Sequence, residues 1–184
     1  MNYNKINVRN YLYTFNQILN QMEKEMLSAN IENNITMDFI RCMIPHHQAA
    51  IYMCENLLRY TYYRPLQEIA KHIIKMKTNE IQEMKEIAKT TSGFGSLPRD
   101  TMYYIEEYKK ITNNMICKMR NSTRCYRINL DFIDEMIPHH EGDLEMCNNL
   151  LKYYVDPRLK CIVENIIKEQ SEEIKELEQI RKSL

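Results

Sequence analysis

The sequence contains the same stretch twice, at an offset of 93 residues. The motif Met-Ile-Pro-His-His occurs at 43–47 and again at 136–140, and Asp-Phe-Ile precedes it in both copies. Across residues 38–87, 23 of 50 positions are identical to those of the second copy without a gap. Because a repeat at a fixed offset is one structural unit used twice, the sequence predicts two equivalent halves that pack as one core.

The two copies join at a short connection. The chain of 184 residues has only 3 glycines and 5 prolines, too few for a turn-dense sandwich or barrel. Two of these glycines, Gly93 and Gly95, lie close together between the copies. We therefore expect a single helical domain over 1–184, with internal repeats at 1–92 and 98–184 and a linker near 91–98.

Apolar residues recur every three or four positions, which is the spacing of an amphipathic helix. In the first segment Leu12, Phe15 and Leu19 follow this spacing, and no segment reads as a strand. Each copy therefore predicts three helices. The expected ranges are 4–29, 36–60, 65–90, 99–120, 129–154 and 157–182. The pattern indicates an all-α bundle of two three-helix repeats with pseudo-two-fold symmetry.

Charge and composition exclude several classes of partner. Lysine and arginine together number 25, as do aspartate and glutamate, so we expect no basic surface for nucleic acid. No apolar run approaches the roughly 20 residues that span a bilayer, and the N-terminus lacks the apolar region of a secretory signal. With six cysteines and no CxxC pair, the sequence predicts a cytoplasmic protein with reduced thiols. Tyrosines clustered at the helix ends fit either caps of the bundle or the interface of a homo-oligomer.

The histidine pairs fall on the apolar face of the second helix of each copy. At about 100° per residue, His46 and His47 lie in the same arc as Phe39 and Leu57. Met43 lies one turn earlier on the same side. We therefore expect buried imidazoles beside a thioether. The second copy repeats this arrangement with Met136, His139 and His140.

A proline precedes each histidine pair. Pro45 and Pro138 lie inside the apolar stripe, where a proline removes a backbone hydrogen bond and costs about 3 kcal/mol. The stripe nevertheless stays in phase from Phe39 to Leu58. We therefore expect the helix to continue through the proline with a kink, rather than to begin there.

Polar residues interrupt the apolar stripe of the third helix at matching places. Lys77 and Glu80 lie within the stripe in the first copy, and Gln170 and Glu173 in the second. An unpaired buried carboxylate is very costly, so each glutamate needs a partner. A histidine of a neighbouring helix and a metal ion are both suitable. We expect Glu80 and Glu173 to lie within reach of the histidines.

Two interpretations of the histidine pairs remain open. Imidazole is the commonest metal ligand in proteins, and a thioether is a soft donor that favours Cu(I). Met43 and the histidine pair then form a copper site in the first copy. Met53 and its counterpart Met146 lie further along the helix as additional thioethers. Alternatively, the imidazoles are core residues bonded to the glutamates, and the methionines fill gaps in the core.

The segments MDFIRCMIPHHQAAIYM and LDFIDEMIPHHEGDLEM resemble the D-x-x-F-x-x-x-M-I-x-H-H-x-x-A-x-x-M signature of the "domain of unknown function 305" family. The resemblance covers nearly the whole chain. It implies a helical bundle of the ferritin-like superfamily, commonly with two such copies, in a family that includes copper-binding proteins. It implies no enzymatic reaction. The metal residues it implies are Met43, His46, His47, Met53, Met136, His139, His140 and Met146.

The second copy departs from this signature at Asp143, where the first copy has Ala50. Asp143 follows His140 by three positions and His139 by four, so one helix face presents two imidazoles and a carboxylate. An oxygen donor favours zinc or iron over copper. We therefore expect either that the second copy prefers a different ion, or that Asp143 accepts a hydrogen bond from a protonated histidine.

These residues suggest three functions. The first is the binding of copper or another soft or borderline ion for storage, buffering or sequestration, with Glu80, Glu173 and Asp143 as further ligands. The second is a structural or assembly role, in which buried His–Glu pairs hold no metal. The third is a ferritin-like redox enzyme, but its Glu-x-x-His motif is absent from the sequence. We therefore favour a metal-binding protein and assign no catalytic residue.

Overall fold

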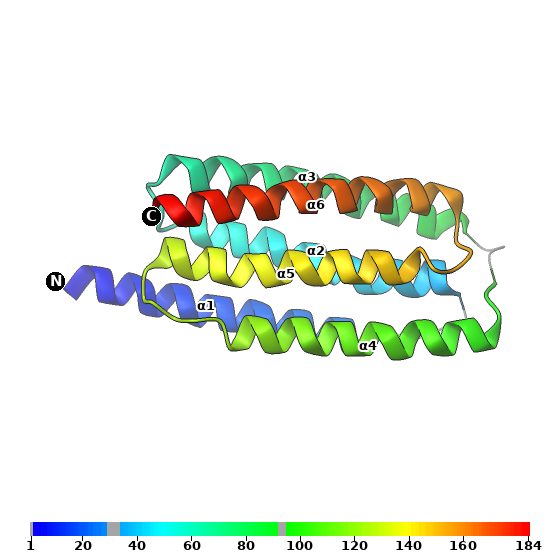
Figure 1. Ribbon diagram of the computed structural model, residues 1–184. Helices are drawn as coiled ribbons and strands as arrows, with labels where there is room; N and C mark the ends of the chain where they lie inside the picture. The colour runs from blue at the N-terminus through cyan, green and yellow to red at the C-terminus, as the bar shows by residue number, and fades with distance from the viewer. Residues whose placement is uncertain (1, 29–33, 92–94) are drawn as a thin grey trace.

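The computed structural model describes residues 2–28, 34–91 and 95–184, which form six α-helices and no strand (Figure 1). The helices are α1 (Asn2–Leu27), α2 (Ile35–Leu58), α3 (Arg64–Thr90), α4 (Pro98–Arg120), α5 (Ile128–Leu150) and α6 (Pro157–Ser183). The predicted all-α architecture is confirmed, with α1–α3 as the first half and α4–α6 as the second. Residue 29, where the first predicted helix ends, and part of the predicted linker (92–94) lie outside the described residues.

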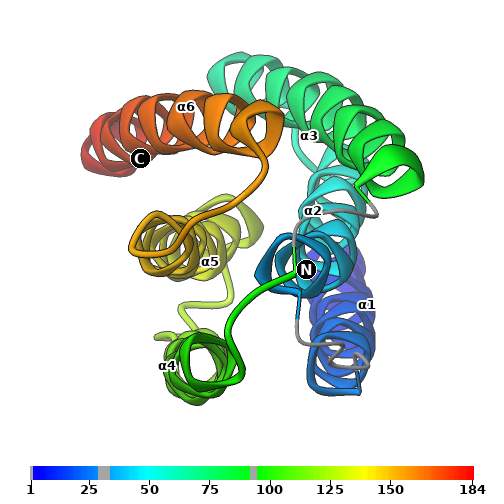
Figure 2. The same ribbon diagram turned by 90° about the vertical axis from the view of Figure 1, so that its right-hand side faces the viewer.

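The helices lie in three layers of two (Figures 1 and 2). The middle layer consists of α2 and α5, which are covered by α3 and α6 on one side and by α1 and α4 on the other. Consecutive helices contact each other within each half. The two halves meet along a seam where α2 packs on α5, α3 on α6 and α1 on α4. The middle helices are therefore enclosed by helices on both sides.

One hydrophobic cluster extends through both halves. Phe39 of α2 and Phe132 of α5, at equivalent positions of the repeat, are both fully buried in it. Burial of an apolar side chain of this size contributes about 1.5–3 kcal/mol. The prediction that the two halves pack together is confirmed. Among the described residues, no helix is both long enough and apolar enough to cross a membrane.

The duplication extends to buried polar contacts. The side-chain amide of Asn56 donates to the backbone carbonyl of Tyr11 at 3.0 Å, and Asn149 donates to the carbonyl of Tyr104 at 3.1 Å. Both pairs join the first helix of a half to its second helix, and they are related by the offset of 93 residues. The two halves are therefore built by the same local interactions.

Prolines mark helix starts at three places and lie within a helix at two. Pro65, Pro98 and Pro157 occupy the first turn of α3, α4 and α6, where the missing amide hydrogen costs nothing. Pro45 and Pro138 lie inside α2 and α5, which continue through them as predicted. Packing on both sides of the middle layer stabilises these helices against the lost hydrogen bond. The kink itself stays a prediction.

The middle helices end earlier than the sequence predicted. The expected range 36–60 passes the end of α2 at Leu58, and 129–154 passes the end of α5 at Leu150. After α2 the amide of Tyr60 donates to the carbonyl of Leu57 at 2.9 Å. Such a bond over three residues tightens the last turn and closes the helix.

Asp156 joins the ends of three helices. It is the N-cap of α6, where its carboxylate accepts a hydrogen bond from the amide of Arg158 at 2.9 Å. The hydroxyl of Thr91, directly after α3, donates to the same carboxylate at 2.7 Å. The amide of Asp156 donates to the hydroxyl of Thr36, in the first turn of α2, at 3.1 Å. The residue is buried, and it fixes where α6 begins relative to both neighbours.

Candidate metal centre

The four histidines of the repeated motif meet in the middle layer. His46 and His47 come from α2, His139 and His140 come from α5, and all four are 0% exposed. The rings of His46 and His139 stack across the seam, with centroids 3.8 Å apart and an angle of 19° between their planes. The predicted burial is confirmed. The two repeated motifs therefore form one joint cluster of imidazoles.

Each buried glutamate reaches a histidine of its own half. Glu80 Oε2 lies 2.7 Å from His47 Nε2, and Glu173 Oε2 lies 3.3 Å from His140 Nε2. The side chains of the two glutamates are only 6% and 5% exposed. The prediction that the glutamates of the third helices lie within reach of the histidines is confirmed.

Lys77 of α3 lies in the same cluster, with a side chain that is 1% exposed. Its ammonium group donates to Glu80 Oε2 at 2.8 Å and to Asp143 Oδ2 at 3.4 Å. The same nitrogen lies 3.5 Å from His47 Nε2. The counterpart of Lys77 in the second half is Gln170, which is uncharged and fully buried. At this position the two halves therefore differ by one buried positive charge.

The lysine makes the two buried glutamates chemically unequal. Burial acts to raise the pKa of Glu80, but the neighbouring His47 and Lys77 outweigh it and hold this pKa well below its usual range. At Glu173 burial dominates over a smaller opposing effect of Lys77 and raises the pKa to about 8. At neutral pH Glu80 is therefore a carboxylate, and Glu173 is a neutral acid.

Lys77 itself stays protonated in the buried cluster. Burial acts to lower the pKa of Lys77, but the carboxylates of Asp143 and Glu80 outweigh it and raise the pKa above its ordinary value. The cluster therefore contains an ammonium ion between two carboxylates.

Three of the four imidazoles are neutral, and several ring nitrogens of the cluster lack hydrogen-bond partners. Burial, together with neighbouring histidines and Lys77, lowers the pKa of His46, His139 and His140 well below its usual value. Both ring nitrogens of His46 and of His139 have no hydrogen-bond partner among the described residues. An unpaired buried polar group costs about 1–3 kcal/mol. Because a neutral imidazole is the form that coordinates metals, the cluster fits a metal ion.

One group of three candidate donors lies close enough to share an ion. The ligand atoms of His46, His47 and Asp143 all lie within 4.8 Å of one another, and no other such group of His, Cys, Asp and Glu occurs in the described ranges. The sequence predicted that Asp143 would form a donor set with His139 and His140 on its own helix, whereas the group found joins Asp143 to the first histidine pair. A ligand role of Asp143 beside His139 and His140 stays a prediction. Because α2 and α5 face each other, the side chain of Asp143 extends across the seam to the other pair.

The alternative prediction for Asp143, a hydrogen bond from a protonated histidine, was wrong. We expected a protonated histidine to donate to its carboxylate, but the donors are Lys77 at 3.4 Å and the thiol of Cys147 at 3.5 Å.

Burial raises the pKa of Cys147 and of Cys54 well above the usual value, so both stay thiols at neutral pH. A thiol is a poor metal ligand compared with a thiolate.

The methionines that the sequence proposed as soft donors all lie in the buried core. Each of them is at most 1% exposed, and they belong to the two middle helices. They are Met43, Met53, Met136 and Met146. Their role as ligands stays a prediction.

Two contacts of the cluster were not expected from the sequence. The first is the contact between Lys77 and Glu80. The sequence placed both residues in the apolar stripe, but we expected the partner of Glu80 to come from another helix or to be a metal ion. The spacing of three residues between Lys77 and Glu80 was the signal, since it brings both side chains together on one helix. The second contact joins His72, which is 55% exposed, to Glu173 at 3.9 Å. No local signal predicts it, because it links α3 to α6 across the seam.

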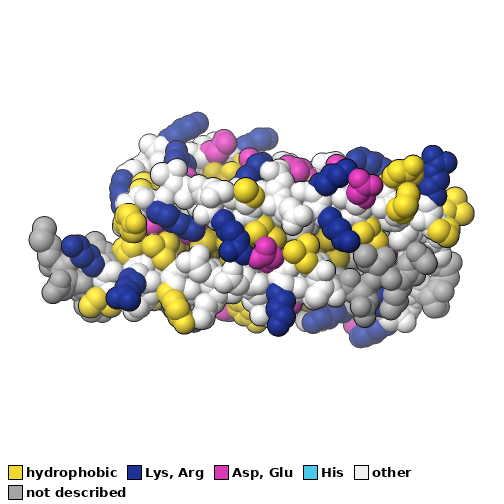
Figure 3. All heavy atoms as spheres, turned by 90° about the horizontal axis from the view of Figure 1, so that it is seen from below, with side chains coloured by type: hydrophobic (Ala, Val, Ile, Leu, Met, Phe, Trp, Pro, Cys, Tyr) yellow, Lys and Arg dark blue, Asp and Glu magenta, His cyan; other side chains and the backbone are white. Residues whose placement is uncertain are grey.

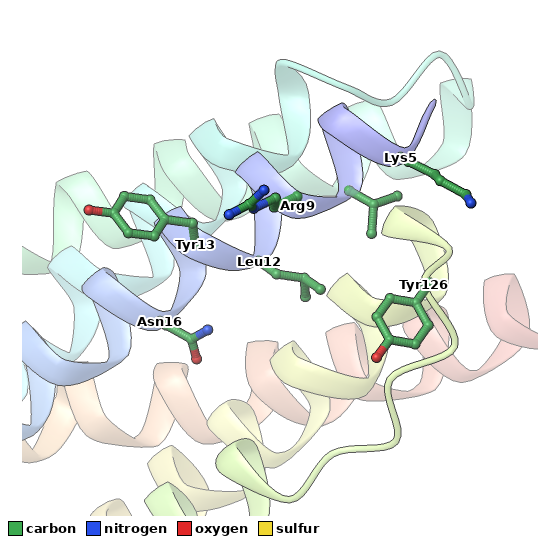
Figure 4. Close-up of a pocket in the computed structure, with 7 residues that line it drawn as sticks. Lys5, Arg9, Leu12, Tyr13, Asn16 and Tyr126 are labelled. Atoms are coloured by element: carbon green, nitrogen blue, oxygen red, sulfur yellow. The ribbon is translucent and has the colours of Figure 1, made fainter. Parts of the chain in front are cut away.

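A surface groove lies apart from this cluster, beside the first half of α1 and the connection between α4 and α5 (Figure 4). Arg9, Leu12 and Tyr126 are among its lining residues, none of which is a His, Cys, Met, Asp or Glu. The face formed by α1 and α4 shows hydrophobic side chains interspersed with Lys and Arg (Figure 3). The groove therefore offers no metal donor set, and the candidate centre is the buried cluster.

Fold and site together define the class: a duplicated six-helix bundle that encloses histidines and carboxylates at the seam of its halves. The family described as "Domain of unknown function (DUF305)" matches residues 14–88 and 106–181, one segment in each half. The chain therefore belongs to the DUF305 family.

Three solved structures share this fold. A crystal structure of a DUF305 fragment from Deinococcus radiodurans has a TM-score of 0.60 at 17% identity, covering 82% of this chain and 97% of that chain. CopM in an Ag-bound form obtained by soaking has a TM-score of 0.59 at 27% identity, covering 80% and 95%. CopM in a Cu(II)-bound form has a TM-score of 0.57 at 26% identity, covering 80% and 96%. None of the curated proteins compared with the chain matches it.

Proposed function

We propose that this protein binds a soft or borderline metal ion, copper above all, in the buried cluster at the seam. The observation that carries the proposal is the group of His46, His47 and Asp143, with donor atoms within 4.8 Å of one another. Neither nitrogen of His46 has a hydrogen-bond partner among the residues described. A bound cation supplies that partner and removes the cost of unpaired buried polar atoms.

The solved relatives support this choice of ion. CopM is described in an Ag-bound and in a Cu(II)-bound form. Imidazole suits copper, and thioethers favour Cu(I) among the ions of copper. We assign Met43 and Met53, which are buried in the same helix as the first histidine pair, as supplementary soft donors. Because all these donors are buried, the ion is held away from solvent, which suits storage, buffering or sequestration.

The second half contributes a further set of donors in this proposal. His139 stacks on His46, and His140 lies beside Glu173, so both belong to the same cluster. Met136 and Met146 are the corresponding thioethers. Zinc or iron, which we expected at the second copy because of Asp143, is now a competitor at the first pair, where Asp143 lies.

A second candidate function is structural, and Lys77 favours it. The ammonium already supplies a cation to Glu80 and Asp143, at 2.8 and 3.4 Å. In this alternative the buried ion pairs fix how the two halves align, and no metal is held. Buried polar groups can specify such alignment in packed helices.

The two candidates differ in metal uptake. We expect the wild-type protein to take up at least one Ag(I) or, under anaerobic conditions, Cu(I) per chain in competition with a chromophoric chelator. Replacing His46 and His47 with Gln should lower the affinity at least tenfold, which is about 1.4 kcal/mol, because two imidazole donors are lost. Circular dichroism verifies that the variant remains helical.

His72→Gln is the matched control, because it removes an exposed histidine outside the group of three donors. Its affinity should equal that of the wild type. Met43→Leu tests the soft donor separately and should weaken Ag(I) binding more than Zn(II) binding. A wild-type protein that takes up no ion, or a double histidine variant with unchanged uptake, rejects the metal function and leaves the structural one.

A further inference from the structure

Lys77 places a fixed positive charge beside the candidate metal donors. Its ammonium nitrogen lies 3.4 Å from an oxygen of Asp143 and 3.5 Å from a nitrogen of His47, two of the three residues in the donor group. An ion that contacts both residues therefore lies next to the ammonium group. Since the side chain is 1% exposed, little water screens this repulsion.

Two carboxylates share this one ammonium group. Glu80 and Asp143 each contribute a carboxylate, and Lys77 contributes one ammonium group in contact with both. These three groups together carry a net charge of −1. A doubly charged cation bound beside Lys77 is repelled about twice as strongly by the ammonium group as a singly charged cation is.

We propose that Lys77 is the specificity-determining residue of this site, and that it makes the buried donors favour a singly charged ion such as Ag(I) or Cu(I) over a doubly charged ion. This inference rests on the proposed metal-binding function. Two imidazoles and a carboxylate would otherwise suit Zn(II), Fe(II) or Cu(II) as well as Cu(I). The donors alone therefore do not exclude divalent ions, and the lysine supplies the discrimination.

The second half provides the natural comparison for this residue. Gln170 occupies the equivalent position, is fully buried and carries no charge. A glutamine is therefore compatible with this place in a third helix. The same exchange in the first half, Lys77→Gln, removes the ammonium and changes the net charge of the three groups from −1 to −2.

The test compares two ions on the same variants. Affinities for Ag(I), in chloride-free buffer, and for Zn(II) are measured by competition with chelators for the wild type and for Lys77→Gln. Both affinities should rise, and that for Zn(II) should rise at least tenfold more, because a double charge interacts twice as strongly with the ammonium. Lys75→Gln is the control, since it removes an exposed lysine from the same helix and should leave both affinities unchanged.

A second pair of variants covers the case in which Lys77→Gln does not fold. Removing the lysine takes one hydrogen-bond donor from the buried Glu80, so the comparison is repeated between Glu80→Gln and Glu80→Gln/Lys77→Gln. The net charge then changes from 0 to −1. Preference should again shift toward Zn(II) when the lysine is lost.

The outcomes separate this inference from the proposed function. If the wild type binds Ag(I) and the ratio of the two affinities does not change on loss of Lys77, the inference is overturned and the metal function stands. If the wild type binds neither ion and the variant gains Zn(II), soft-ion binding fails, but the exclusion of divalent ions by Lys77 is upheld. If no variant binds either ion, both proposals are overturned.

Discussion

At the scale of single residues, Gly142 sets how closely α5 approaches α4. A Cβ atom at this position would lie 2.4 Å from the sulfur of Met115 and 2.9 Å from its Cβ. The sulfur is at the flexible end of the side chain, but the Cβ is not, so the helices would have to separate. We expect Gly142→Ala to destabilise the protein by about 1–3 kcal/mol in urea denaturation. This is a net loss, because the cost of the steric clash outweighs the roughly 1 kcal/mol by which alanine stabilises a helix interior relative to glycine.

Gly95→Ala is the control for this prediction, because nothing lies within 4 Å of a Cβ added there. Its stability should remain within about 0.5 kcal/mol of the wild type, as for other surface changes. Gly142→Ala should also cost less in a Met115→Ala background, where the opposing side chain is gone. A Gly142→Ala variant as stable as the wild type would show that the helices adjust without strain.

At the scale of the helix, Asp156 holds the start of α6 against its neighbours. Its hydrogen bonds with Arg158 dominate over burial and hold its pKa well below the usual range. A carboxyl with a lowered pKa in the folded state contributes stability above about pH 4, which is lost as pH falls through the folded pKa. Asp156→Asn should therefore cost about 1–3 kcal/mol at pH 7, and the difference from the wild type should shrink toward pH 3.

Unfolding by urea at several pH values measures this difference. Glu68→Gln serves as the control, since Glu68 forms an exposed pair with Arg64 in which the two side chains are 61% and 86% exposed. Exposed pairs contribute about 0–1 kcal/mol, so this change should be small at every pH. A difference for Asp156→Asn that stays constant from pH 7 to 3 would exclude the ionised carboxylate as its source.

Helices were the part of the fold that the sequence predicted well, because their signal is local. The apolar stripe fixed the face of α2 that carries His46 and His47, and it placed Glu80 inside the core. The ends of α2 and α5 were predicted too late, since the closing turns depend on bonds over three residues rather than on periodicity.

At the scale of the whole molecule, Tyr11 ties the first half to the second. Its hydroxyl, in α1, donates to Glu135 of α5 at 2.6 Å, and the same fully buried carboxylate also pairs with Arg124. Tyr11→Phe removes one donor from a buried carboxylate. We expect it to lower the free energy of unfolding by about 1–3 kcal/mol in urea denaturation.

The repeat supplies a matched control for this contact. Tyr104 occupies the position of Tyr11 in the second half, is equally buried, and has a hydroxyl without a hydrogen-bond partner within the described part of the chain. Tyr104→Phe should therefore be nearly neutral or slightly stabilising. Equal losses in the two variants would mean that the bond to Glu135 contributes nothing beyond the packing of the ring.

The contacts between the two halves are the part of the structure that could not be predicted from the sequence. Duplication indicated two halves, but it did not indicate which residues would meet between them. The stack of His46 on His139 and the contact of Lys77 with Asp143 both join residues far apart in the chain. Such contacts depend on how α2 and α5 face each other, which no periodicity within one helix determines.

A fused chain can hold a combination of charged side chains that a symmetric dimer of identical halves cannot. In a two-fold homodimer every side chain at the axis occurs twice, so a lysine or an aspartate there is always matched by a second one. A dimer of first halves would bring two lysines and no aspartate to the axis, and a dimer of second halves would bring two aspartates and no lysine. Because both halves lie in one polypeptide, Lys77 and Asp143 can each occur once. The pairing of one lysine with one aspartate at the seam therefore depends on the duplicated halves having diverged within a single chain.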